Sequence, residues 1–280
     1  MTTERAEQDT VAFEVREGVA WVKFNRPEKR NCMSPKLNRQ MLRVIEDLEF
    51  RDDVGVLVLS GEGTAWSAGM DLKEYFRESE VQGLRGVRHS QREAYAWWDR
   101  LRWYQKVTIA MVNGWCFGGG YGPLFACDLA FCSDDAQFGL SEINWGILPG
   151  GGATKVATEL MPMRKAMYHA LLGENLVGRD AAAAGLVNES VPADELEARV
   201  NAVAQNLLKK NLRALKATKD AVRRVREMTY DNAEDYLIRG QEALNWHDGS
   251  EGRLEGMKQF LDEKTYKPGL GEYDKSKAAG

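Results

Sequence analysis

The sequence predicts a mixed α/β fold in which sets of two strands and a helix repeat before a helical region. Three observations carry this prediction. Short apolar or alternating segments suited to strands recur, each set is followed by apolar residues at helical spacing, and this order appears three times before Gly150. We expect a sheet-containing core over residues 11–192, a helical region over residues 193–272, and flexible tails at residues 1–10 and 273–280.

Composition narrows the class of protein. The 280 residues have a net charge of −4 and 44% hydrophobic content, which gives no general attraction to nucleic acid or to anionic lipid. The start lacks an apolar signal segment, and no apolar run is long enough to span a membrane. The three histidines are scattered and the four cysteines show no metal-binding spacing. We expect a cytoplasmic protein without a metal, a membrane or a nucleic acid as partner.

The first set begins with a hairpin. The segments 11–16 and 19–24 alternate or run apolar on either side of Glu17-Gly18. The turn over residues 25–31 then carries three cations, which suit either a solvated loop or a small anionic ligand. Ser34-Pro35 opens a helix, because a capping residue precedes a proline in its first turn. The apolar face of this helix is expected to consist of Leu37, Met41, Val44, Ile45 and Leu48.

The second set contains a buried strand over residues 54–59 and a glycine-rich turn. Asp71 is suited to cap a helix that starts near Leu72, so the backbone N–H of Met70 should lie just outside that helix. Basic residues at helical spacing follow between residues 77 and 92. The aromatic segment over residues 95–104 is interpreted as helix packing.

The third set is where we expect the chemistry. A strand over residues 109–112 leads to glycines 118–120 and a helix over residues 121–126. A second strand, residues 129–132, is followed by a loop that contains Glu142. An oxygen placed at the glycines would meet unpaired N–H groups and the positive end of a helix dipole. The stretch could therefore hold an oxyanion and move a proton, although a tight turn that only packs a helix on a strand is the alternative.

Several other site classes do not fit. Pro123 stands where the last glycine of a dinucleotide fingerprint would fall, and no Walker lysine follows the glycines. A nucleophile elbow is absent, and no cysteine stands beside a candidate base, so covalent acyl-enzyme chemistry is not favoured. The later residues predict helices around Pro162, a short strand over residues 185–192, and helices over 193–261 with breaks near residues 211, 229 and 249.

Five motifs occur in an order typical of a known family. They are N-R-P-E-K-R-N (25–31), S-A-G-M-D-L-K-E-Y (67–75), N-G-W-C-F-G-G-G (113–120), F-G-L-S-E-I-N-W-G-I (138–147) and G-L-V-N-E-S-V-P (185–192). Together they resemble the crotonase superfamily of enoyl-CoA hydratases and isomerases. The tryptophan variants and G-M-K-Q-F-L-D-E-K-T-Y-K-P-G-L (256–270) resemble its hydroxycinnamoyl-CoA hydratase-lyase branch.

The resemblance implies a crotonase-like spiral of β-β-α turns and a C-terminal helical region that forms a trimer or a dimer of trimers. It implies that an acyl-CoA carbonyl binds between the N–H groups of Met70 and Gly119, with coenzyme A as part of the substrate and no separate cofactor. Glu142 becomes the acid-base residue, poised by apolar Ile143 and Trp145. The residues expected at coenzyme A are Lys29, Arg30, Ala68, Lys73, Phe260 and Lys264.

Two positions depart from the family pattern. Gly122 replaces the glutamate of hydratases and the serine of the branch, which puts a two-carboxylate mechanism in doubt. Ile238 stands where the branch has a second tyrosine, so phenol recognition is expected to rest on Tyr75, with Tyr236, Tyr121 and Trp145 as further candidates for the substrate pocket.

The expected activity is hydration of a 4-hydroxycinnamoyl-CoA (feruloyl-, coumaroyl- or caffeoyl-CoA) followed by carbon–carbon cleavage. The products would be an aromatic aldehyde, vanillin from feruloyl-CoA, and acetyl-CoA. Two alternatives stay open: an enoyl-CoA hydratase or isomerase acting on another acyl-CoA, and a crotonase-fold binding protein without activity.

Overall fold

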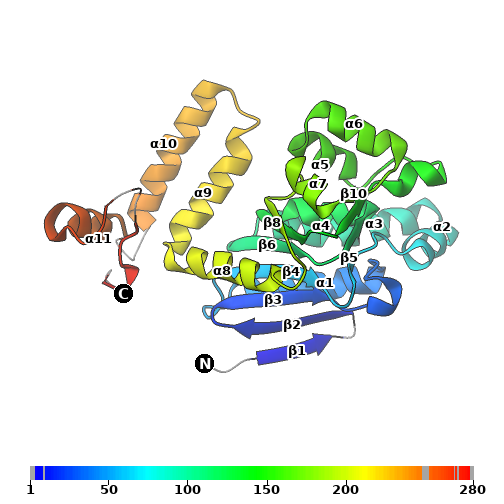
Figure 1. The fold of residues 1–280 in the computed structure, drawn as a ribbon, viewed down its shortest axis with the longest axis horizontal. Coiled ribbons are helices and arrows are strands. Elements are labelled where there is room, and N and C mark those ends of the chain that lie inside the picture. Colours follow the sequence, from blue (N-terminus) through cyan, green and yellow to red (C-terminus); the bar gives the residue numbers. More distant parts are fainter. Residues whose placement is uncertain (1–3, 9, 248–251, 268, 270, 278–280) are drawn as a thin grey trace. The chain divides into compact units, whose positions relative to one another are not determined.

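The computed structural model describes residues 4–8, 10–247, 252–267, 269 and 271–277. The chain divides into two compact units. The first comprises residues 1–104 and 108–202, and the second comprises residues 105–107 and 203–280. Figure 1 labels the helices and strands of both units along the chain.

A seven-stranded sheet forms the larger layer of strands. Its spatial order is β1 (Glu4–Gln8), β2 (Val11–Arg16), β3 (Val19–Phe24), β4 (Val56–Gly61), β6 (Val107–Val112), β8 (Leu129–Ser133) and β11 (Glu189–Val191). The pairs β1–β2 and β2–β3 are antiparallel, whereas β3–β4, β6–β8 and β8–β11 are parallel. Every residue of β4 and β6 is buried, which explains their mostly apolar sequences, because parallel strands are covered on both faces.

A smaller sheet contains β10 (Leu176–Val177), β9 (Gln137–Gly139), β7 (Trp115–Phe117) and β5 (Ala65–Ser67), in that order. The strands β5, β7 and β9 are mutually parallel, so their carboxyl ends lie at one edge of this sheet. The segments after these three ends hold Met70, the glycines 118–120 and Glu142. The small sheet therefore brings together residues that are far apart in the sequence.

Helices complete both units. Those up to residue 183 are α1 (Pro35–Glu49), α2 (Glu78–Val81), α3 (Gly83–Arg102), α4 (Tyr121–Ala126), α5 (Ala153–Leu160), α6 (Met163–Leu172) and α7 (Gly178–Ala183). Those that follow are α8 (Leu196–Lys209), α9 (Leu212–Val225), α10 (Tyr230–His247) and α11 (Gly252–Lys258). The short helices are η1 (Pro27–Lys29), η2 (Leu72–Arg77), η3 (Gly118–Gly120), η4 (Ser141–Trp145), η5 (Gln259–Glu263) and η6 (Lys275–Lys277).

Most local predictions are confirmed. The Ser34 side chain accepts a hydrogen bond from the Leu37 amide at 3.2 Å, and all five apolar residues predicted for α1 are buried. The hairpin strands and α4 have the predicted bounds. The helical breaks near residues 211 and 229 are also present, whereas the break near residue 249 falls outside the described residues.

Three predictions were wrong in detail. The strand expected over residues 54–59 is β4, which starts two residues later because the Val54 amide bonds back to Arg51 in a turn. Residues 4–8, expected to be a flexible tail, form β1 along the free edge of β2, whose unpaired backbone groups can pair with a polar segment. Near the other end, the Asp274 amide donates to Gln259 Oε1 at 2.8 Å and η6 follows, so the described residues there are ordered by hydrogen bonds.

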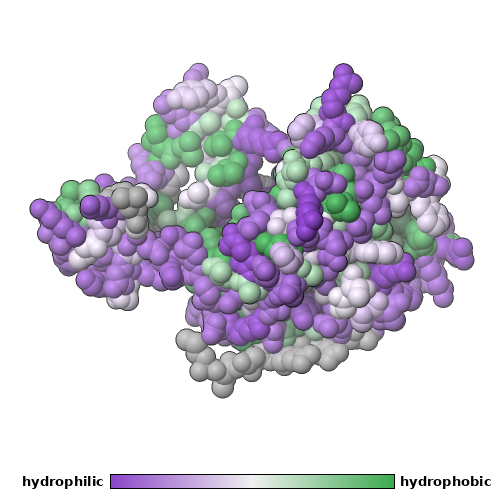
Figure 2. Space-filling model, viewed as in Figure 1, coloured by the Kyte–Doolittle hydropathy of each residue, from purple (hydrophilic) through white to green (hydrophobic). Residues whose placement is uncertain are grey.

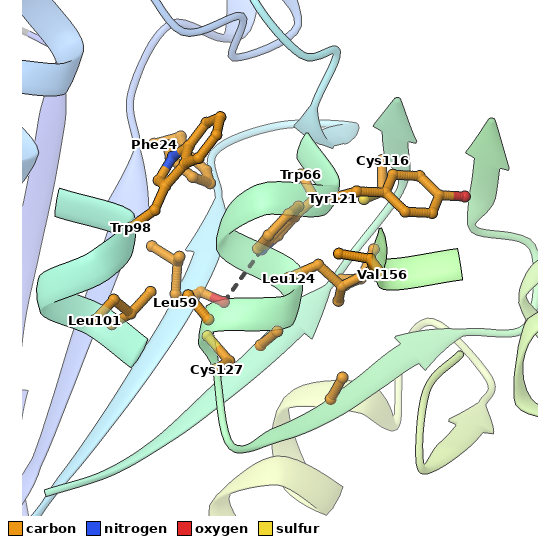
Figure 3. Close-up of a cluster of buried hydrophobic side chains, with 14 of the residues drawn as sticks. Phe24, Leu59, Trp66, Trp98, Leu101, Cys116, Tyr121, Leu124, Cys127 and Val156 are labelled. Carbon is orange, nitrogen blue, oxygen red and sulfur yellow. Dashed lines mark hydrogen bonds between the residues drawn. The ribbon is translucent and has the colours of Figure 1, made fainter. Parts of the chain in front are cut away.

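The core of the first unit is rich in aromatic side chains. Its largest fully buried members include Trp21, Trp66, Trp97, Tyr104 and Tyr121. Figure 3 shows part of this core around α4, where the Trp66 indole N–H donates to the Leu59 carbonyl at 3.2 Å.

Some large hydrophobic side chains are exposed. One group lies over α6 in the view of Figure 2, where Met163, Met167, Leu171 and Leu172 are among the exposed residues. None of the helices in the described part of the chain is both long and apolar enough to span a membrane.

Candidate active site

Met70 lies three residues after the end of β5, in a segment whose neighbouring backbone groups are held by hydrogen bonds. The Met33 amide donates to the Gly69 carbonyl at 2.7 Å, and the Asp71 amide donates to the Met33 carbonyl at 3.0 Å. Because successive residues of an extended segment direct their backbone groups to opposite sides, these bonds leave the Met70 N–H on the other side. That amide has no acceptor within the described part of the chain.

Two glycines bring the second amide next to the first. A β-carbon placed on Gly69, whose φ is +89°, would lie 2.6 Å from the Phe117 carbonyl oxygen and 3.1 Å from the Gly119 amide nitrogen. A β-carbon on Gly119 would lie 3.3 Å from the Met70 amide nitrogen. Gly119 is the second residue of η3, where helix geometry supplies no acceptor for the N–H. The two amides that the sequence singled out are therefore neighbours.

Glu142 lies beside the glycine turn. It belongs to η4, which follows β9, and its Oε1 would be 2.7 Å from a β-carbon placed on Gly118. The other carboxyl oxygen, Oε2, is buried and has no hydrogen-bond partner among the described residues. Burial raises the pKa of the Glu142 carboxyl above its ordinary value. The Glu142 carboxyl, which can transfer a proton, therefore lies beside the same glycine turn that carries the Gly119 amide.

Ile143 and Trp145, expected to supply an apolar wall for Glu142, are both exposed, Trp145 to 67%, so that role stays a prediction. The Glu142 carboxyl lies against Gly118 at a place that a β-carbon would occupy, so this approach requires a glycine. Trp145 remains a candidate for contact with substrate.

Gly122 has a specific neighbour. A β-carbon on Gly122 would lie 2.7 Å from Cε3 and 2.8 Å from Cδ2 and Cζ3 of Trp98. The indole of Trp98, on α3, is 8% exposed and occupies the space that any side chain at position 122 would need. A second carboxylate at this position is therefore sterically excluded while Trp98 is present.

The aromatic candidates separate into two groups. Tyr75, on η2, is buried, and burial together with nearby Tyr95 raises the pKa of its phenol to about 12. It can therefore act as a neutral hydrogen-bond donor. Tyr121 was expected in the substrate pocket, but its side chain is fully buried and its hydroxyl bonds to His169 at 2.8 Å. That expectation was wrong, because the ring packs into the core.

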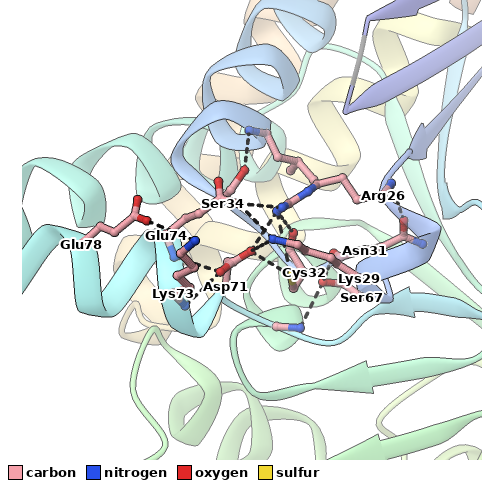
Figure 4. Close-up of polar contacts among 12 residues, drawn as sticks. Arg26, Lys29, Asn31, Cys32, Ser34, Ser67, Asp71, Lys73, Glu74 and Glu78 are labelled. Atoms are coloured by element: carbon pink, nitrogen blue, oxygen red, sulfur yellow. Dashed lines mark hydrogen bonds and ion pairs between the residues drawn. The ribbon is translucent and has the colours of Figure 1, made fainter.

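Arg26 is a site residue that the sequence did not single out. Its guanidinium is buried and lies 3.2 Å from Asp71 Oδ2 and 2.9 Å from Glu74 Oε1 (Figure 4). The other oxygen of Asp71 accepts from the amides of Lys73 and Glu74 at 3.0 and 2.9 Å. Although burial acts to raise the pKa of Asp71, these hydrogen bonds hold it below its ordinary value. These contacts hold Asp71, the residue that follows Met70, in place. In the sequence, only the opposite charges of the segments 25–31 and 71–74 hinted at the pairing of Arg26 with Asp71 and Glu74.

The cations expected at coenzyme A have partners in the chain. Lys29 Nζ lies 3.2 Å from Glu74 Oε1, and this hydrogen bond raises the Lys29 pKa. The Arg30 guanidinium stacks on the Trp115 ring at 4.1 Å. Lys73 is largely exposed, with Nζ 4.0 Å from Glu78, and the Ala68 amide donates to the Arg30 carbonyl at 2.9 Å. All four lie around the Met70 segment, so a contact with coenzyme A stays a prediction for them.

The remaining candidates belong to the second unit. Tyr236 and Ile238 are on α10, where Ile238 is exposed and Tyr236 is half-buried. Phe260 is an exposed residue of η5, and Lys264 ends that helix in a left-handed conformation with φ of 55°. Their roles at a substrate stay predictions.

Known proteins resemble the chain over almost its whole length. The family model for enoyl-CoA hydratase/isomerase matches residues 14–268. A hydroxycinnamoyl-CoA hydratase-lyase of Pseudomonas fluorescens is 51% identical over 98% of this chain and 99% of its own. A 2,3-dehydroadipyl-CoA hydratase of Escherichia coli is 29% identical over 86% of this chain and 91% of its own. The structure of Pseudomonas aeruginosa AtuE aligns with a TM-score of 0.82 and 29% identity, covering 91% of this chain and 97% of AtuE.

Proposed function

The chain belongs to the enoyl-CoA hydratase/isomerase family, and from this premise we propose that it hydrates a 4-hydroxycinnamoyl-CoA and cleaves the adduct. The observation that carries the proposal is the carboxyl of Glu142, whose Oε2 is buried without a hydrogen-bond partner among the described residues, beside the neighbouring amides of Met70 and Gly119. The 51% identity to a hydroxycinnamoyl-CoA hydratase-lyase supports this substrate class. The products would be an aromatic aldehyde, vanillin in the case of feruloyl-CoA, and acetyl-CoA.

The amide pair stabilises the charge that the reaction creates. When water adds to the β-carbon of the conjugated thioester, electrons move to the thioester oxygen and give it the character of an enolate. The Met70 and Gly119 N–H groups need no reorganisation to meet that oxygen, because no other acceptor within the described residues holds them. Loss of one such donor typically costs ~2.7–4 kcal/mol of transition-state stabilisation.

Glu142 moves the protons of the hydration step. Its carboxylate takes a proton from the attacking water, and the carboxylic acid then returns that proton to the α-carbon, which gives the β-hydroxy thioester. A group that both takes and gives a proton works best with a pKa near the working pH. The burial of Glu142 moves its pKa in that direction.

The same groups serve the cleavage step. Glu142 takes the proton of the β-hydroxyl, a carbonyl forms at the β-carbon, and the bond between the α- and β-carbons breaks. Its electron pair passes to the thioester as the acetyl-CoA enolate, whose oxygen again faces the two amides. Protonation of the α-carbon by Glu142 completes acetyl-CoA. No second carboxylate is needed, which agrees with the indole of Trp98 filling the place beside Gly122.

A para-hydroxyl on the ring favours the cleavage step, because its electrons conjugate with the aldehyde carbonyl that forms at the β-carbon. The buried Tyr75 phenol supports recognition of that hydroxyl, since a neutral phenol can donate or accept a hydrogen bond. For the anionic phosphates of coenzyme A, we propose the exposed amine of Lys73 and the amine of Lys29.

We further propose that copies of the chain assemble as a trimer or a dimer of trimers. The support is the exposed apolar surface of α10, where Leu237, Ile238 and Trp246 are 47%, 54% and 87% exposed. Light scattering coupled to size-exclusion chromatography would give the mass in solution. A monomer at micromolar concentration would contradict this part of the proposal.

A substrate comparison tests the activity. The purified protein is given feruloyl-CoA and, separately, crotonyl-CoA, and the products are separated by chromatography. We expect vanillin and acetyl-CoA in equal amounts from feruloyl-CoA and little hydration of crotonyl-CoA. Hydration of crotonyl-CoA without aldehyde from feruloyl-CoA would instead indicate an enoyl-CoA hydratase.

A further inference from the structure

The first residue of α4 takes part in a buried hydrogen-bonded chain that lies behind the site. Tyr121 follows the glycine turn, and its amide bonds back to the carbonyls of Gly118 and Gly119. Its hydroxyl lies 2.8 Å from Nε2 of His169, on α6, and Nδ1 of the same ring lies 3.0 Å from the Glu174 carbonyl oxygen. Both side chains are almost completely buried.

The direction of every bond in this chain is determined. A carbonyl oxygen can only accept, so His169 Nδ1 must carry a hydrogen and donate to Glu174. In the neutral ring Nε2 is then an acceptor, and the Tyr121 hydroxyl donates to it. Burial lowers the pKa of His169 and raises that of Tyr121, so both side chains are neutral near pH 7.

The position of Tyr121 links this series of hydrogen bonds to the reacting groups. In Figure 3, its ring points away from α4 on the side opposite Trp98. The negative charge of Glu142 is near enough to contribute to the raised pKa of the Tyr121 phenol. Because Tyr121 follows Gly120 directly, a shift of its ring would move the backbone that carries the Gly119 amide.

We propose that Tyr121 and His169 are positioning residues that anchor the first turn of α4 to α6 and so hold the Gly119 amide in place beside Glu142. Neither side chain touches the substrate. Their effect is on the geometry of the transition state, because a small displacement of an amide from the developing oxyanion weakens stabilisation of that charge more than it weakens substrate binding.

Kinetics of four variants test this inference, which rests on the proposed function only for its assay. Tyr121→Phe and His169→Leu each remove one partner of the hydrogen bond between Tyr121 and His169. For each variant we expect kcat on feruloyl-CoA to fall about tenfold, while KM changes less than about twofold. His169→Gln keeps an acceptor near the position of Nε2 and should restore most of kcat. The double variant Tyr121→Phe/His169→Leu should lose about as much as either single variant, because both act through one bond.

Tyr168→Phe is the matched control. Tyr168 is the neighbour of His169 on α6, but its side chain is exposed and its hydroxyl bonds to the Glu174 carboxylate at 3.3 Å. Its kcat should equal that of the parent protein. Unchanged kcat in folded Tyr121→Phe, or losses that multiply in the double variant, would overturn the inference.

A measurement without substrate keeps the inference testable if a variant fails to fold or if feruloyl-CoA is not turned over. In ¹⁵N-histidine-labelled protein near pH 7, the His169 ring should appear as the neutral tautomer with hydrogen on Nδ1, assigned by its loss in His169→Gln. A protonated ring, or hydrogen on Nε2, would overturn the inference. Absence of turnover by the parent protein would count against the proposed function alone.

Discussion

A methyl group added at Gly122 should collide with Trp98, and this collision can be measured. In the structure the β-carbon of Gly122→Ala would be 2.7–2.8 Å from three carbons of the indole. Carbon atoms at optimal separation are ~3.5–4.0 Å apart, so the ring or the helix must move by about 1 Å. Overpacking of this kind costs about 1–3 kcal/mol, and alanine recovers ~1 kcal/mol of helix propensity.

Whether Gly122→Ala destabilises or stabilises the protein should depend on Trp98. In the parent protein we expect Gly122→Ala to lower the free energy of unfolding by up to about 2 kcal/mol, the overpacking cost less the recovered helix propensity. In a Trp98→Leu background the space is open, so the same substitution should be neutral or stabilising by up to ~1 kcal/mol. Urea denaturation of the four proteins gives the coupling between the two positions as a double-mutant cycle.

The chain also provides a matched control. Gly240 is a glycine inside α10, and a β-carbon there would have no heavy atom within 4 Å. Gly240→Ala should therefore stabilise by ~1 kcal/mol whatever residue stands at position 98. An equal cost of Gly122→Ala in both backgrounds would refute the reasoning, since it would show that Trp98 does not occupy the space beside Gly122.

Three further outcomes are expected. Glu142→Gln should abolish turnover, because it removes the group that transfers the proton. It should also raise the free energy of unfolding near pH 7. Folding raises the pKa of the Glu142 carboxyl, so the contribution of this group to stability is greatest below its unfolded pKa and is lost as pH rises through its folded pKa. In the parent protein, kcat/KM plotted against pH should decline on the acid side with a pKa above the ordinary value of a glutamate. Glu142→Asp should shift the pH at which this decline occurs. Arg26→Met should lower the free energy of unfolding by up to about 3–5 kcal/mol in urea denaturation, because it removes the buried cation 3.2 Å from the Asp71 carboxylate and leaves only the half-exposed amine of Lys29, 3.7 Å away; a loss below ~1 kcal/mol would contradict the assigned role.

Local features of the fold were predictable because each depends on a few neighbouring residues. Ser34-Pro35 and Asp71 carry the capping chemistry that begins α1 and η2, and both bonds are present. Backbone properties indicated the Met70 amide, just outside a helix, and the glycines 118–120, whose N–H groups lack partners, and the family resemblance then selected Gly119 among those glycines.

Features that depend on packing between distant segments were not predictable. Nothing in the sequence indicates that Trp98 would fill the space beside Gly122, because the two come from different helices. The burial of Arg26 was missed for the same reason, since its partners lie some 45 residues further along the chain. Tyr121 was a candidate for the pocket, but its ring is buried in the core and its hydroxyl bonds to His169, a residue 48 positions further along the chain.

The central claim is that one carboxyl serves both half-reactions. The most direct measurement supplies the β-hydroxy thioester of feruloyl-CoA hydration to the parent protein and to Glu142→Gln, and follows release of vanillin separately from the hydration of feruloyl-CoA. We predict that the parent protein performs both steps and that Glu142→Gln performs neither. Cleavage of the β-hydroxy thioester by Glu142→Gln at the parental rate would contradict the account, because another group would then have to remove the hydroxyl proton.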